Sequence, residues 1–431
     1  MSQQAGLSFE QAPPFALPLR FFLSAPLFLL AAAILIVVAP DSLASRWTPQ
    51  ALALTHALTL GFLAMVMLGA LVQMLPVVAG ATIPFSRPVA WLTHVPLAIG
   101  TAALMAGFLS GDVLLHQIGI ALLAAAFGVF VVAAASSLMR AVASATVSGA
   151  RFAVASLALA VALGLALALS RSGAWTLADT AAVIAAHAAL GLLGWVLLLV
   201  VGVAYQVVPM FQITPPYPPR LARWLVPVLF ALLLVLALAP LLPPAAATAV
   251  VLMAQIGLAV GILVFALVTL RLQSQRRRKL PDVTLDFWRV GMASLIASVV
   301  AWVLAQLWPA WADNDAYPLL LGVLFIGGFA VSVVSGMLYK IVPFLAWFHL
   351  QAQLQARAGS IPTMKDMIPE QVKRWQLRLH LGALVLLVGA IFWPSWLGLP
   401  AGTLLAFSAL LLQLNLISAV RRFLRHGGRF S

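Results

Sequence analysis

The chain has 431 residues, of which 64% are hydrophobic and 8% charged, with a mean hydropathy of +1.10. This composition excludes a soluble globular domain, because apolar runs long enough to cross a bilayer recur along the whole chain. The absence of cysteine excludes disulfides, thiolate metal sites, c-type haem attachment and iron–sulfur clusters. We therefore expect an all-α polytopic membrane protein in which residues 1–431 form a single membrane domain.

Twelve transmembrane helices are expected after a short irregular leader, Met1–Leu19, which is rich in proline and glutamine. Each run can cross the hydrocarbon core, which is about 30 Å thick, as one helix. The expected spans are 20–40, 52–80, 88–110, 113–137, 151–170, 180–209, 223–243, 246–271, 287–308, 317–344, 376–394 and 397–420. An even number of spans places both ends of the chain on one side of the membrane.

Lys and Arg are distributed unevenly between the two sides of this topology. The chain carries 24 of them against 10 Asp and Glu, which gives a net charge of +14. Only Arg46 and Arg171 fall on one side, and the other cations fall on the opposite side. The positive-inside rule therefore predicts cytoplasmic N- and C-termini, in a bacterial-type inner membrane. Because the cations lie at helix ends, the expected partner is the lipid bilayer and not nucleic acid.

The longest stretch outside the spans is the loop 345–375, which this topology makes cytoplasmic. Its segment LQAQLQARAGS is predicted to form a short amphipathic helix that ends at Gly359 and lies on the inner surface of the membrane.

One pattern of glycine, aromatic residues and proline occurs three times. The copies read GFLAMVMLGALVQMLP (61–76), GWVLLLVVGVAYQVVP (194–209) and GFAVSVVSGMLYKIVP (328–343). Their prolines are separated by 209 − 76 = 133 and 343 − 209 = 134 residues, and the copies lie four spans apart. A fixed period of this length indicates tandem duplication. It predicts three parallel, pseudo-symmetric four-helix repeats at approximately 20–140, 151–275 and 287–420.

Several polar residues occupy matched positions in these copies. They are Gln73, Gln206 and Lys340, and the pair Tyr205 and Tyr339. A structural role explains them: small matched residues let helices approach closely, proline ends a helix near the cytoplasmic face, and Gln or Lys there reaches carbonyls or headgroups. We interpret these five residues as parts of a repeated helix end.

Three histidines, His56, His187 and His116, are the candidate metal or cofactor ligands. Each lies in the first turns of an even-numbered span, so all three are expected at one depth near the outer face. A buried imidazole in lipid needs a partner, and a haem iron or a metal ion is one. A hydroxyl or carbonyl group is the alternative, which the sequence leaves open. The other four, His94, His349, His380 and His426, are expected at interfaces, in the loop after Pro343 or in the tail.

The repeated architecture and two segments resemble subunit I of the haem-copper oxidases. HAALGLLGWVLLLVVGVAYQVVPMFQITPPYPPRL (187–221) resembles the helix VI region of C-type oxidases and nitric oxide reductases. HALTLGFLAMVMLGALVQMLPVVAG (56–80) resembles helix II of the same proteins and the first motif of the NnrS family. The resemblance implies a b-type haem, with His56 at the position of the low-spin haem ligand and His187 at that of a copper ligand. It also implies a redox partner protein.

The chain departs from that family at the residues that assemble its binuclear centre. The expected span 223–243 lacks the adjacent histidine pair of helix VII, and the span 317–344 contains no histidine. Leu321 stands at the position matching His187, and Val323 at the position matching His56. No acidic residue lies deep in an expected span, so a carboxylate proton channel is not expected either. We therefore expect a degenerate member of the superfamily that does not reduce oxygen as a terminal oxidase.

These observations leave three functional hypotheses. The first is a haem-binding membrane protein that acts in electron transfer or in handling or sensing nitric oxide. The second is a permease for a metal ion or small solute on the same scaffold, with the histidines, Gln73 and Gln206 lining its path. The third is a membrane assembly partner without a cofactor. Haem spectra separate the first hypothesis from the other two.

Overall fold

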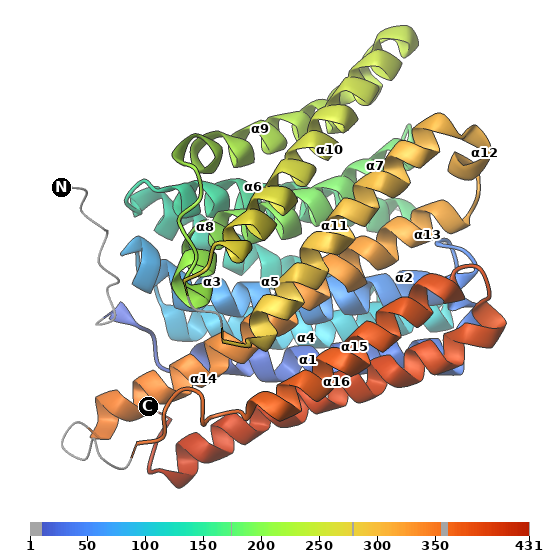
Figure 1. The fold of residues 1–431 in the computed structure, drawn as a ribbon. Helices are drawn as coiled ribbons and strands as arrows, with labels where there is room; N and C mark the ends of the chain where they lie inside the picture. The colour runs from blue at the N-terminus through green and yellow to red at the C-terminus, as the bar shows by residue number, and fades with distance from the viewer. Residues whose placement is uncertain (1–10, 174, 278–279, 355–360, 431) are drawn as a thin grey trace. The chain divides into compact units, whose positions relative to one another are not determined.

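The computed structural model describes residues 11–173, 175–277, 280–354 and 361–430, and every regular element in these ranges is helical (Figure 1). Eleven helices among them are long and apolar enough to cross a membrane. The chain is therefore a polytopic helical membrane protein. The eleventh expected span corresponds to α15 (Glu370–Ala390), which is not among the eleven. Its first turns carry Glu370, Lys373, Arg374 and Arg378, which lower its hydropathy.

The chain divides into two units, and the first comprises Met1–Ala12, Gln73–Pro96 and Ile120–Lys279. Its own elements are α6 (Ala145–Arg171), α7 (Thr180–Ala189), η4 (Leu190–Leu197), α8 (Leu198–Gln212), α9 (Pro219–Leu238), η5 (Ala239–Leu241) and α10 (Pro244–Ser274). Helix α6 packs along η4 and α8, and α9 packs against α10.

The second unit comprises Pro13–Val72, Leu97–Gly119 and Leu280–Ser431. Its own elements are α1 (Ala16–Val38), η2 (Pro40–Leu43), α2 (Pro49–His56), η3 (Ala57–Ala64), α11 (Val283–Leu307), α12 (Pro309–Ala312), α13 (Ala316–Gly322), η6 (Val323–Val331), α14 (Ser332–Leu354), α15 and α16 (Pro394–Arg425). Helix α16 packs along both α1 and α15. The helices α3 (Met65–Ala79), α4 (Ser86–Ser110) and α5 (Val113–Arg140) each contribute to both units.

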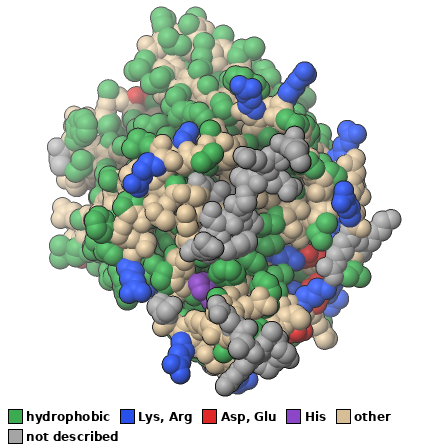
Figure 2. Space-filling model, turned by 90° about the vertical axis from the view of Figure 1, so that its left-hand side faces the viewer, with side chains coloured by type: hydrophobic (Ala, Val, Ile, Leu, Met, Phe, Trp, Pro, Cys, Tyr) green, Lys and Arg blue, Asp and Glu red, His purple; other side chains and the backbone are tan. Residues whose placement is uncertain are grey.

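Large apolar side chains are exposed in many places, as Figure 2 shows for one face, where Lys and Arg stand among hydrophobic side chains. Trp396 is 82% exposed and Leu241 is 81% exposed. Exposed apolar surface on this scale is unfavourable in water and suits contact with lipid.

The three repeat prolines lie inside helices, so the expectation that they end helices is wrong. Helix α3 continues beyond Pro76 to Ala79, α8 continues beyond Pro209 to Gln212, and α14 continues beyond Pro343 to Leu354. Proline removes one donor and leaves the rest of the helix intact, and membrane helices tolerate this well.

The extension of α14 changes the expected loop 345–375. Its first residues, up to Leu354, are helical, and His349 lies in α14 with its ring stacked on Phe15 at 5.5 Å between centroids. The predicted amphipathic helix begins within the end of α14, and its remaining residues, 355–360, lie outside the described residues.

Three π-helical segments, η3, η4 and η6, interrupt the helices that carry the repeated pattern. Their last residues, Ala64, Leu197 and Val331, are separated by 197 − 64 = 133 and 331 − 197 = 134 residues, the same spacings as the repeat prolines. π-helix is rare and occurs mostly as single turns, often at functional sites. Its occurrence at the same place in three sequence copies is therefore a property of the repeated pattern.

Two matched glycines in each copy bring that helix close to the helix that precedes it in the repeat. A Cβ atom at Gly61, Gly194 or Gly328, all within π segments, would collide with Phe28, Ser156 or Ser294 respectively. At Gly69, Gly202 or Gly336 it would collide with Phe21, Gly149 or Phe287. In every copy the two contacted residues are seven apart (28 − 21, 156 − 149 and 294 − 287), which is about two helical turns. Small residues at such contacts allow close helix packing in lipid.

Candidate functional site

His187 lies in α7 of the first unit, shortly before η4, with a hydrogen bond to a neighbouring helix. Its Nδ1 is 2.8 Å from the carbonyl oxygen of Ala160 in α6. Because a carbonyl only accepts, Nδ1 must donate, and the neutral ring then carries its lone pair on Nε2. Gly164, one turn further along α6, leaves room for the ring, since a Cβ there would be 3.0 Å from His187 Cε1. In this tautomer Nε2 carries the free lone pair, which is the arrangement that a metal-ligating histidine would need.

His56 ends α2 in the second unit, directly before η3, and has the same tautomer. Its Nδ1 is 2.8 Å from the carbonyl oxygen of Leu52, in its own helix. The imidazole also contacts the ring of Phe108, with 5.2 Å between centroids. Phe108 also contacts His116, with 5.0 Å between the ring centroids in an edge-on arrangement. A phenyl ring, which cannot ligate a metal, therefore contacts both of these candidate ligands.

The predicted ligands do not assemble into one multidentate site within the described residues. No group of three or more His, Cys, Asp or Glu side chains suited to a metal ion occurs in that part of the chain. His187 belongs to the first unit, and His56 and His116 belong to the second. Each imidazole is therefore a separate candidate ligand.

The repeat-matched residues of the third copy form specific polar contacts. Lys340 Nζ is 2.8 Å from Asp282 Oδ2, and both side chains are largely buried. The other carboxylate oxygen of Asp282 accepts the backbone N–H of Thr284 at 3.0 Å and so caps α11. Asn415 Nδ2 donates to the hydroxyl of Tyr339 at 2.9 Å. Lys340 was expected to reach headgroups or carbonyls, and it pairs with a carboxylate instead.

The matched residues of the other two copies have different surroundings. Gln73 is 8% exposed, and its Oε1 has no hydrogen-bond partner among the described residues. The hydroxyl of Tyr205 also has no hydrogen-bond partner among the described residues. The centre of its ring lies 5.2 Å from that of the Tyr217 ring. Tyr217 in turn bonds to Thr269 at 2.9 Å, and burial raises the pKa of its hydroxyl, which stays neutral. Gln206 is half-buried in α8.

His380 is a buried histidine that the sequence did not single out. It was expected at an interface, but it is 2% exposed, and its Nε2 is 2.7 Å from Ser332 Oγ. The ring lines a cavity of about 140 Å³ within the second unit. The expected span began at residue 376, whereas α15 begins at Glu370, so His380 lies in the middle of the helix. No motif around His380 indicates its burial.

No protein-family model matches the chain, and no curated protein matches it either. A relationship to haem-copper oxidase subunit I is therefore an expectation from the sequence alone. The roles proposed for individual residues therefore rest on their hydrogen-bond partners and burial.

Proposed function

We propose that the protein binds a b-type haem in the inner membrane and acts in electron transfer or in handling or sensing nitric oxide. His187 in the first unit and His56 in the second are the proposed ligands, each as a separate candidate. The observation that carries the proposal is the hydrogen bond that His187 Nδ1 donates to the carbonyl oxygen of Ala160. The absence of a side chain at Gly164 leaves room for the imidazole ring in this position. This leaves Nε2 as the ligating nitrogen, and the same imidazoles suit copper.

The donor set fits an axial role in a haem site. Neutral imidazole is a common axial ligand, and the absence of cysteine in the chain leaves histidine and methionine as the natural choices. The cavity beside His380 is not the place for the macrocycle. Its volume of about 140 Å³ is close to that of an engineered cavity that holds one benzene ring, far below a porphyrin. When bound, the haem would supply a redox-active iron that can transfer an electron or bind nitric oxide.

We propose twelve spans, with α15 as the twelfth, arranged as three parallel four-helix repeats with both termini in the cytoplasm. The matched ends of the three π segments support the repeats, as do the three glycine pairs. The placement of all cations except Arg46 and Arg171 supports the orientation. A redox partner protein would then dock at one membrane face.

A reduced-minus-oxidised absorption spectrum of the purified protein tests the haem proposal. Wild type expressed with an ample haem supply should show sharp α-bands, and His187→Ala should lose or broaden them, as should His56→Ala. His426→Ala is the matched control, because His426 is exposed and makes the same Nδ1 contact to a carbonyl, that of Arg422 at 2.8 Å. It should keep the wild-type spectrum.

Nitric oxide added to the reduced protein then separates the two activities. A shift of the Soret band indicates an open axial position and favours nitric oxide handling, whereas an unchanged spectrum favours electron transfer. A colourless and well-folded wild type would contradict the haem proposal.

One observation favours the permease as the second candidate. The third π segment, η6, is retained although no histidine stands near its start. A π segment without a nearby histidine fits the hypothesis in which the repeated helices line a path for a solute and do not hold a cofactor. Uptake of metal ions or small solutes by proteoliposomes of a colourless wild type would support this function.

A further inference from the structure

The helix α15 is held along α16, which is one of the helices long and apolar enough to cross a membrane. Gln376 Nε2 in the second turn of α15 donates to Ser408 Oγ of α16 at 2.8 Å. Near the other end of α15, a Cβ at Gly389 would lie 2.6 Å from Leu397 Cδ1 of α16. Both ends of α15 therefore contact α16, and α15 lies at membrane depth although its own first turns are polar.

Two exposed tryptophans fit the two membrane interfaces on this side of the second unit. Trp375 in α15 is 52% exposed, and Trp393, which precedes α16, is 61% exposed. They are separated by 393 − 375 = 18 residues, about 27 Å at the rise of a helix, close to the hydrocarbon thickness of about 30 Å. Tryptophan is enriched at both interfaces. Exposed side chains between these two residues therefore face lipid.

Arg378 is an exposed cation between these two tryptophans. It lies one turn beyond Trp375, with its guanidinium carbon 4.7 Å from the centre of the Trp375 ring. This stacking turns the charged group back toward the interface, as in an arginine that snorkels. The ion pairs of the described residues do not include Arg378. A cation that faces lipid is costly, so its presence inside a span indicates a functional partner.

The first turns of α15 carry a surplus of positive charge next to Arg378. Lys373 and Arg374 share one carboxylate, that of Glu370, at 2.7 and 3.3 Å. Residues 370–378 contain three cations and one acid, which leaves 3 − 1 = 2 positive charges. Such a surplus at a membrane surface attracts anionic headgroups, and a guanidinium can donate two hydrogen bonds to one phosphate.

The surface beyond Arg378 is apolar and suits acyl chains. Val385, two turns further along the same face of α15, is 70% exposed. Phe407 of α16, next to Ser408 and so near the level of Arg378, is 57% exposed. A second copy of the chain would offer no carboxylate at this depth, because no acidic residue lies deep in a span. An anionic group joined to apolar chains therefore matches this surface best.

We propose that Arg378 and Trp375 form a binding site for a phospholipid with a net negative headgroup, in the leaflet at the start of α15. The guanidinium binds the phosphate, the indole ring holds the guanidinium in place, and the apolar face carries the acyl chains. The orientation proposed above makes this leaflet cytoplasmic. The site rests on α15 as a span and is independent of haem, so the haem spectrum and the lipid test can fail separately.

Native mass spectrometry of the full-length protein in detergent tests the proposal with two lipid probes. They are dioleoylphosphatidylglycerol and dioleoylphosphatidylcholine, which have the same chains and differ in net headgroup charge. The expected result is saturable binding of the first anionic lipid, about ten-fold tighter than that of the zwitterionic one. Soluble glycerol phosphate should not displace it, because the acyl chains contribute to binding. Equal binding of the two lipids overturns the proposal, as does displacement by glycerol phosphate. A dimer of wild type that Arg378→Leu dissociates would assign this face to a second copy and also overturn it.

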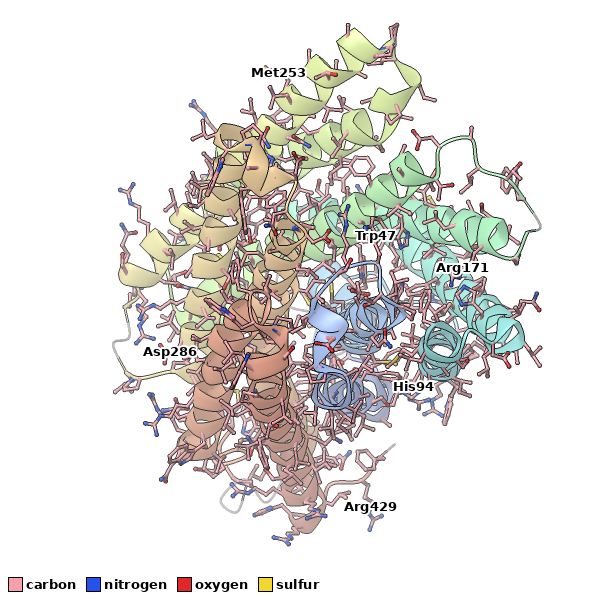
Figure 3. All side chains as sticks on the ribbon, turned by 90° about the vertical axis from the view of Figure 1, so that its right-hand side faces the viewer. Trp47, His94, Arg171, Met253, Asp286 and Arg429 are labelled. Carbon is pink, nitrogen blue, oxygen red and sulfur yellow. The ribbon has the colours of Figure 1, made fainter. Side chains whose placement is uncertain are left out.

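Three variants place the bound lipid at this site. Arg378→Leu should weaken the anionic lipid about ten-fold, and Arg378→Lys about three-fold, because lysine keeps the charge without the forked geometry. Arg46→Leu is the matched control. The guanidinium carbon of Arg46 is 4.5 Å from the centre of the Trp47 ring, but this pair lies in the turn before α2 and not within a helix (Figure 3). This variant should bind as wild type does. Unweakened binding in well-folded Arg378→Leu, or an equal loss in Arg46→Leu, would contradict the proposal.

Discussion

Gly202→Leu is expected to destabilise the protein by about 3 kcal/mol or to prevent its folding. A Cβ at Gly202 would lie 2.6 Å from the Cα of Gly149, which is backbone and cannot turn aside as a side chain can. The helices α6 and α8 would have to separate and lose packing along their length. Unfolding by SDS in mixed micelles, followed by circular dichroism, measures the loss.

Gly191→Leu is the matched control for this prediction. Gly191 lies earlier in the same membrane-crossing helix, and its Cβ would have no atom within 4 Å. Leucine also has a higher helix propensity than glycine by about 1 kcal/mol, so the change should leave the stability equal to wild type or slightly above it. An equal loss in both variants would show that the close approach to Gly149 is not what requires glycine at 202.

The second large effect is expected from Asp282→Ala. This change removes the partner of Lys340 and the cap of α11 together. The two side chains are 19% and 15% exposed, so the loss should lie between those of exposed and buried ion pairs, at about 3 kcal/mol including about 1 kcal/mol for the cap. The same unfolding measurement gives the value.

A second-site change separates the two contributions. Gln occupies the positions matching Lys340 in the other two copies, at Gln73 and Gln206. In the Asp282→Ala background, Lys340→Gln removes the unpaired charge and should reduce the loss to about 1 kcal/mol, the cost of the missing cap. If the double variant is no more stable than Asp282→Ala alone, the ion pair does not contribute as described.

The helices could be predicted from the sequence largely because lipid requires long apolar runs. The earlier start of α15, at Glu370, could not, because its first turns are amphipathic and lie outside the apolar window. The π segments could not be predicted from the sequence either. The helix from α7 to α8 is apolar on all sides. The extra residue of a π turn therefore does not alter any pattern of alternating apolar and polar residues in its sequence. Only the repeated glycines indicated a special position.

The candidate ligands could be predicted because an imidazole is conspicuous in an apolar run. Their supports could not be predicted, since the partners of His187 and His56 are backbone carbonyls, which every residue possesses. The hydrogen-bond partner of the buried His380 is Ser332, 48 residues away in the sequence. Asp282 escaped notice for another reason, as it lies just outside a span and meets Lys340 only when α11 and α14 pack together.

The π segments also bear on how this chain could gain or lose residues. A π turn accommodates one more residue than an α turn, so it is the natural remnant of a single-codon insertion in an α-helix. Deleting one residue within Leu190–Leu197 would let the helix return to α geometry without lengthening any loop. Because a π turn closes with one residue more than an α turn, losing that residue would leave the stretches on its two sides in their original orientation. His187 would then keep its contact with Ala160, so the helix could lose one residue here without turning the candidate ligand away from its partner.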